Sequence, residues 1–154
     1  MSVYFAMCAE VDFNIGKILE ALNESGQANN TMVIFTSDHG EMFGNNWMFG
    51  KKGWWDHSYR IPLIIHTPKS KSRIITQMTE SVDLAPTIMN WVNGEIPVDW
   101  NGRSLLSLVK TGKSKFRPRD FVVYEWDFRE LYENKPKQRI KISPEESNLS
   151  IIRT

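Results

Sequence analysis

The 154-residue chain has little of three features that would indicate a class of function: cysteine, an excess of charge of one sign, and long hydrophobic runs. Its single cysteine, Cys8, excludes an internal disulfide and a metal site built on cysteines. The 19 Lys and Arg residues oppose 18 Asp and Glu residues, and a formal net charge of +1 gives no long-range field to attract a polyanion. We therefore expect no nucleic-acid partner and no membrane partner, although this overall balance does not exclude a local basic patch.

The hydrophobic runs are short. Residues 62–65 form one of the longest, far below the roughly 20 residues that span a bilayer. The first twenty residues carry Glu10, Asp12 and Glu20 in place of a signal peptide's basic start and apolar stretch, so no export signal is expected. The length and 41% hydrophobic content suit one globular domain or a piece of one. The lone cysteine favours a reducing, cytoplasmic compartment but also fits periplasmic proteins, so the localisation stays open.

The apolar pattern predicts an α/β arrangement. Apolar residues recur at three- and four-residue steps over residues 2–22, which predicts an amphipathic helix that ends at Ser25-Gly26. The runs at residues 32–35 and 62–66 are apolar on successive positions, as in strands covered on both faces of a parallel sheet. A helix, a strand, a polar loop and another strand therefore follow one another.

The second half of the chain predicts fewer regular elements. A helix is expected over residues 83–92, with Pro86 in its first turn, where the missing N–H costs nothing. One or two helical turns are expected over 103–109 and a strand over 121–126. Two further expectations are a long surface excursion at residues 129–148 and, at 149–154, a strand that lacks a partner.

Polar residues follow the first predicted strand at once, from Ser37 to Glu41. In open α/β sheets the ligand crevice lies beyond the carboxyl ends of the strands, so Asp38 and His39 are well placed to bind a ligand. A carboxylate and a neutral imidazole are both metal ligands, but two ligands do not complete a site, and others must come from elsewhere. The alternative is that Asp38 caps the next turn and His39 is a satisfied polar residue.

A pair of lysines flanked by glycines lies further along, at residues 50–53. Glycine lets the backbone approach a ligand closely, and a lysine presents a point charge suited to a tetrahedral anion such as sulfate or phosphate. The alternative is a solvated turn, because lysines are mostly exposed.

Aromatic residues gather in the same glycine-rich segment. They suit the walls of a small-molecule pocket, but partial burial against the fold or a contact with another protein explains them equally well. The aromatic cluster consists of Phe43, Trp47, Phe49, Trp54, Trp55 and Tyr59.

Five ordered segments carry a family resemblance. They are residues 35–41 (FTSDHGE), 50–51 (GK), 58–65 (SYRIPLII), 81–87 (SVDLAPT) and 102–106 (GRSLL). Together they resemble the sulfatase family of the alkaline phosphatase superfamily, and its phosphonate monoester hydrolase and arylsulfatase branch is the most similar. The resemblance implies an alkaline phosphatase-like α/β fold, here a parallel or mixed sheet flanked by helices. It also implies hydrolysis of small-molecule sulfate, phosphate or phosphonate esters.

The resemblance assigns roles to four residues. A strand-end Asp followed by His supplies two ligands of a divalent metal in this family, which implies Asp38 and His39 here, with Mn²⁺ or Ca²⁺ as the metal. Lys51 is implied to contact the non-bridging oxygens of the ester, where charge grows in the transition state. Lys52 is the weaker candidate for that role. His57 is expected either to face the leaving group as a catalytic residue or to have a structural role at the surface.

One part of the family pattern is absent. These enzymes carry a Cys-x-Pro-Ser/Ala-Arg motif, whose cysteine becomes the formylglycine nucleophile, and further metal-binding acids and a histidine lie in the same part. Cys8 lacks this context, and we interpret it as a small buried residue on the apolar side of a helix. We therefore expect residues 1–154 to be the C-terminal portion of such a hydrolase, truncated at both ends and inactive alone. The alternative is a stand-alone binding or assembly module that exposes apolar surface and forms homo-oligomers.

Overall fold

A computed structural model describes residues 2–127 and 148–154 of the chain. The order of its elements confirms the α/β class. The helices are α1 (Ser2–Glu24), α2 (Asp56–Tyr59), α3 (Leu84–Trp91) and α4 (Leu106–Thr111), and the strands are β1 (Val33–Thr36), β2 (Leu63–His66), β3 (Val122–Asp127) and β4 (Asn148–Arg153). Short 3-10 turns lie at Ala28–Asn30, Asn45–Trp47 and Ser81–Asp83. The surface excursion expected at 129–148 lies, apart from Asn148, outside the described residues.

The strands pair as two antiparallel ribbons. β1 pairs with β2 in the register Val33 to His66, and β3 pairs with β4 in the register Val122 to Arg153. The pairing corrects three expectations. Where a parallel or mixed sheet was expected, both strand pairs of the described residues are antiparallel. The residues expected to begin a strand without a partner, 149–154, lie largely in β4, which pairs along its whole length with β3. β1 and β2 are not covered on both faces, and Ile64 is 61% exposed. The expectation of burial failed because an apolar run shows that both faces of a strand are suited to burial but does not show what covers them.

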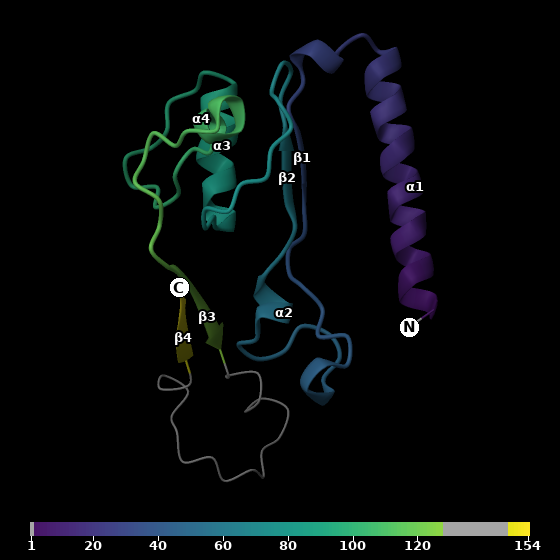
Figure 1. The fold of residues 1–154 in the computed structure, drawn as a ribbon, viewed down its shortest axis with the longest axis vertical. Helices are drawn as coiled ribbons and strands as arrows, with labels where there is room; N and C mark the ends of the chain where they lie inside the picture. The colour runs from purple at the N-terminus through teal and green to yellow at the C-terminus, as the bar shows by residue number, and fades with distance from the viewer. Residues whose placement is uncertain (1, 128–147) are drawn as a thin grey trace.

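Helix α1 stands to one side of the β1–β2 ribbon (Figure 1). None of its residues is buried, and its apolar positions face solvent over most of its length. It touches the rest of the described chain where Tyr4 and Phe5 pack against Phe43, with ring centroids 4.6 and 5.8 Å apart. Cys8 is exposed, so the expectation of a buried cysteine is wrong. None of the described helices combines the length and apolarity needed to cross a membrane.

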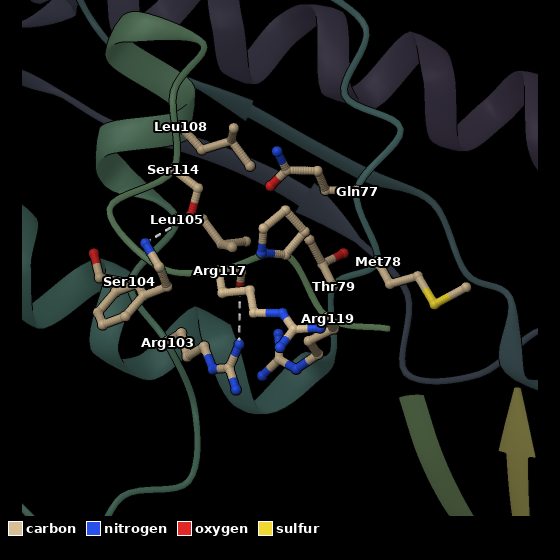
Figure 2. A pocket seen from close by; sticks show the side chains of 12 residues that line it. Gln77, Met78, Thr79, Arg103, Ser104, Leu105, Leu108, Ser114, Arg117 and Arg119 are labelled. Carbon is tan, nitrogen blue, oxygen red and sulfur yellow. Dashed lines mark hydrogen bonds between the residues drawn. The ribbon is translucent and has the colours of Figure 1, made fainter. Parts of the chain in front are cut away.

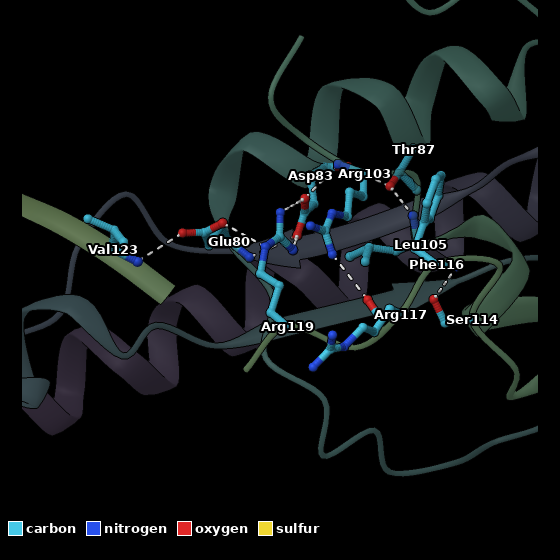
Figure 3. A network of polar contacts seen from close by, with 10 residues as sticks. All are labelled: Glu80, Asp83, Thr87, Arg103, Leu105, Ser114, Phe116, Arg117, Arg119 and Val123. Atoms are coloured by element: carbon cyan, nitrogen blue, oxygen red, sulfur yellow. Dashed lines mark hydrogen bonds and ion pairs between the residues drawn. The ribbon is translucent and has the colours of Figure 1, made fainter. Parts of the chain in front are cut away.

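The best-buried part of the described chain surrounds α3 and α4 (Figure 3). Leu105, Leu106 and Leu108 are buried there beside the fully buried Asp83 and Thr87. The Thr87 hydroxyl donates to the Asp83 carbonyl at 2.6 Å and accepts from the Leu105 N–H at 2.8 Å, which ties the two helices together. This unit lies on the side of the β1–β2 ribbon opposite α1 (Figure 1).

Candidate functional site

The loop after β1 presents Asp38 and His39 next to each other. The Asp38 side chain is 85% exposed, and its Oδ2 lies 3.5 Å from His39 Nε2. The backbone N–H of His39 donates to Asp38 Oδ1 at 2.9 Å. This hydrogen bond is the main cause that holds the pKa of Asp38 below its usual value, so the carboxylate is ionised at neutral pH. The bond joins adjacent residues, so it differs from the capping contact of the alternative interpretation, in which the side chain accepts from an N–H two or three residues on.

Asp38 and His39 each offer a lone pair that suits a metal cation. His39 Nδ1 lies 2.8 Å from the carbonyl oxygen of Gly40, which can only accept a hydrogen bond, so Nδ1 carries the proton. In the neutral ring the lone pair is then on Nε2, the atom that faces Asp38. A carboxylate oxygen and an imidazole nitrogen thus lie 3.5 Å apart at an exposed position. No cluster of three or more His, Cys, Asp or Glu side chains that could hold a metal occurs in residues 2–127 and 148–154.

Gly40 joins this loop to helix α2. Its N–H donates to the carbonyl of Ser58 at 2.8 Å. A Cβ at this position would overlap the carbonyl oxygen of His57, so only glycine fits. The backbone of the Asp38–Gly40 segment is therefore fixed against the backbone of α2.

The lysine turn is held by two side chains that sequence reasoning missed. Glu41 Oε1 accepts from the N–H groups of Phe43 at 3.0 Å and Gly50 at 2.6 Å, which closes the loop between them. The buried hydroxyl of Ser58 pairs with both the N–H and the carbonyl of Lys52 at 3.1 Å. These polar residues carry no local pattern that reveals the contact, since Glu41 bonds to backbone nine residues away and Ser58 to backbone six residues away.

Helix α2 thus connects the segments that contain the expected site residues. Ser58 bonds to Gly40 through its carbonyl and to Lys52 through its hydroxyl. The structure brings Asp38 and His39 into side-chain contact and holds the turn of Lys51 on the same short helix that contains His57. The side chains of Lys51 and His57 are exposed.

The aromatic cluster divides among several surfaces. Phe43 packs on α1, Tyr59 stacks on Tyr124 at 3.9 Å between centroids, and Trp54 stacks on Trp55 at 5.8 Å. Trp47 is 98% exposed. Partial burial against the fold therefore explains Phe43 and Tyr59. Neither residue lines the pocket beside α4 or the pocket around Arg117 and Phe121.

One of those pockets lies beside α4 (Figure 2). Its volume of about 20 Å³ admits about one water molecule. Its guanidinium groups are already engaged, since Arg103 donates to the carbonyl of Arg117 at 3.1 Å and Arg119 is paired with Asp83. This pocket is a structural feature of the α3–α4 unit and lies apart from the Asp38 loop.

Comparison with known proteins defines the class of this α/β chain. A model of the sulfatase family matches residues 1–94, which include all the candidate residues discussed above. The chain therefore belongs to the sulfatase family. This membership confirms the resemblance recognised in the sequence.

The similar proteins are arylsulfatases and phosphonate monoester hydrolases. The multifunctional alkaline phosphatase superfamily protein PehA of Trinickia caryophylli is 36% identical over 98% of this chain and 30% of its own length. Arylsulfatase K of Xenopus laevis is 39% identical over 73% of this chain and 21% of its own length. The structure of the phosphonate monoester hydrolase SpPMH from Silicibacter pomeroyi superposes with a TM-score of 0.85 and 36% identity, covering 94% of this chain and 29% of that one. The chain thus spans less than a third of the length of these relatives.

Proposed function

We propose that this chain supplies the metal-binding loop and the anion-binding loop of a hydrolase that cleaves sulfate, phosphate or phosphonate monoesters. The observation that carries the proposal is the attachment of both loops to one residue of α2, Ser58. Family membership supports a sulfuric ester or phosphonate monoester hydrolase. The ester class stays as broad here as it is among the relatives.

In this proposal each residue has a role that its chemistry allows. Asp38 and His39 hold a divalent cation, Mn²⁺ or Ca²⁺, through the carboxylate and Nε2, and the cation supplies Lewis acidity toward the ester oxygens. Lys51 binds the non-bridging oxygens through its ammonium group, because a compact positive charge stabilises the negative charge that develops there. His57 faces the leaving group, where an imidazole can deliver a proton.

The chain acts only together with other polypeptide in this proposal. The Cys-x-Pro-Ser/Ala-Arg motif that would yield the formylglycine nucleophile does not occur in its sequence. Two metal ligands also leave most of the coordination shell to be supplied from elsewhere. We therefore propose that the isolated chain does not turn over these esters.

A chimera tests the role of Lys51. In the phosphonate monoester hydrolase from Silicibacter pomeroyi, the segment that superposes on this chain is replaced by this chain, and hydrolysis of an aryl phosphonate monoester is measured. Lys51→Ala should lower kcat/KM by about 10²–10³-fold, as expected for the loss of one group that stabilises transition-state charge. Lys52→Ala is the matched control and should change kcat/KM by less than about threefold, because only the backbone of Lys52 is engaged. Equal effects of the two substitutions would contradict the assignment.

A second candidate function is favoured by α1. Its exposed apolar residues Met7, Val11 and Ile18 present a hydrophobic helix face that suits self-association or assembly. As a stand-alone module, the chain would form homo-oligomers through this face and would not need Lys51. The same chimera separates the two candidates, since a pure assembly module would give no activity that depends on Lys51.

A further inference from the structure

Helix α2 makes contacts in two directions. Through Ser58 it holds the Asp38–Gly40 segment and the lysine turn. Through Asp56 and Tyr59 it meets the β3–β4 hairpin, which lies outside the residues matched by the family model. A movement of the β3–β4 hairpin can therefore reach the candidate site through the four-residue helix α2.

An ion pair fixes the first residue of α2 to the last residue of β4. Arg153 Nε lies 2.9 Å from Asp56 Oδ1, and Arg153 Nη2 lies 2.8 Å from Oδ2. Two parallel N–H donors on one carboxylate define direction as well as distance. Both side chains are only partly exposed, so solvent screens the pair less than it would a pair at the open surface. The contact joins residues that are 97 positions apart in the sequence.

Two tyrosines make the rest of the contact. The Tyr124 hydroxyl donates to the carbonyl of Trp54 at 3.0 Å, and the Tyr59 hydroxyl donates to the carbonyl of Glu125 at 3.1 Å. Their rings stack at 3.9 Å with an interplanar angle of 24°. Partial burial raises the pKa of each phenol, so both hydroxyls stay protonated as donors well above neutral pH.

These contacts hold the backbone just before α2 and the first residue of α2, a few residues after Lys51. Tyr124 bonds to the backbone before α2, and Arg153 bonds to the side chain at its start. A shift of the hairpin would move α2, and with it the two hydrogen bonds that Ser58 makes to Gly40 and Lys52. Contacts of this kind set the distance between catalytic groups, on which rates depend steeply.

We propose that the β3–β4 hairpin positions the Asp38–His39 loop and the Lys51 turn relative to each other, with Arg153 and Tyr124 as positioning residues that act through α2. The proposal rests on the function proposed above for those two loops. Neither Arg153 nor Tyr124 touches the ester in this arrangement. Their effect is on the geometry of residues that would.

Amide hydrogen exchange of the whole 154-residue chain tests the proposal without any ligand. Arg153→Gln should speed exchange of the Gly40 and Lys52 amides at least tenfold, while the amides of α3 keep their rates. Arg153→Lys should recover part of the protection, because it restores the charge without the two-donor geometry. Tyr124→Phe keeps the ring stack and removes only the bond to Trp54, and should give a smaller change at the same two amides.

Arg117→Gln is the matched control. It removes the same charge from an exposed arginine that pairs with Asp120 at 2.8 Å, and should leave Gly40 and Lys52 unchanged. Unchanged exchange at Gly40 and Lys52 in Arg153→Gln and Tyr124→Phe would overturn the proposal, as would an equal change in the α3 amides. The exchange measurement uses no metal and no ester, so it does not depend on the proposed function. If the proposed function is wrong and the positioning role is right, the activity of the chimera will not depend on Lys51, while Arg153→Gln will still speed exchange at Gly40 and Lys52.

Discussion

Replacing Asp83 with Ala is expected to lower the free energy of unfolding by about 3–5 kcal/mol, because it breaks a buried ion pair and leaves the partner charge behind. The Asp83 side chain is fully buried and accepts from Arg119 Nη1 at 2.6 Å and Arg119 Nη2 at 2.7 Å. It also accepts from the N–H groups of Arg103 at 2.7 Å and Glu80 at 3.0 Å (Figure 3). The Arg119 side chain is only 10% exposed, and without Asp83 its one ion-pair partner among residues 2–127 and 148–154 is Glu80, 2.9 Å from its Nε.

Urea unfolding of the two variants Asp83→Ala and Asp120→Ala measures this effect against a control. Asp120 also pairs with an arginine at 2.8 Å, but its side chain is 69% exposed, so its loss should cost no more than about 1 kcal/mol. A loss of similar size in both variants would show that the Asp83 network contributes no more than a surface ion pair does. The α3–α4 unit would then have to be stabilised mainly by its leucines.

Gly40→Ala is expected to be the most damaging single change at the candidate site. The added Cβ would overlap the carbonyl oxygen of His57, and both partners are backbone, so the loop or α2 has to move. Overpacking of this kind lowers the free energy of unfolding by about 1–3 kcal/mol, and we expect the upper end here because no side chain can move aside. The displacement would also break the 2.8 Å bond from Gly40 to Ser58 that joins the two halves of the site.

Gly16→Ala is the matched control for this substitution. Gly16 lies in the middle of α1 with nothing within 4 Å of the added Cβ, so alanine should stabilise the helix by about 0.5–1 kcal/mol. The midpoint temperature of thermal unfolding should therefore fall in Gly40→Ala and rise in Gly16→Ala. A Gly40→Ala protein as stable as the parent chain would contradict the close approach of Gly40 to α2.

Elements with a local sequence signal could be predicted closely. The expected helix at 2–22 is observed as Ser2–Glu24, and the one at 83–92 as Leu84–Trp91, because apolar spacing and a proline in the first turn are properties of the segment itself. Strand partners depend on distant parts of the chain. The strand expected at 121–126 was found at Val122–Asp127, but its pairing with β4 was not foreseen.

The candidate site shows the same division. Asp38 and His39 are adjacent in sequence after a strand, and that local pattern was enough to single them out. Glu41 and Ser58, which hold the loops by hydrogen bonds to backbone, have no such pattern and were found only in the structure. The exposure of Cys8 was missed because an apolar helix face shows its suitability for burial and does not identify what covers it.

We propose that the loop after β1 holds a divalent cation through Asp38 and His39. Broadening of backbone amide resonances by Mn²⁺ tests it directly, since paramagnetic broadening locates even a weakly bound ion. We expect the amides of Asp38, His39 and Gly40 to broaden first, Ser58 to follow because it is bonded to Gly40, and Asp38→Ala to abolish the effect. Broadening centred on other residues and unchanged in Asp38→Ala would contradict the claim.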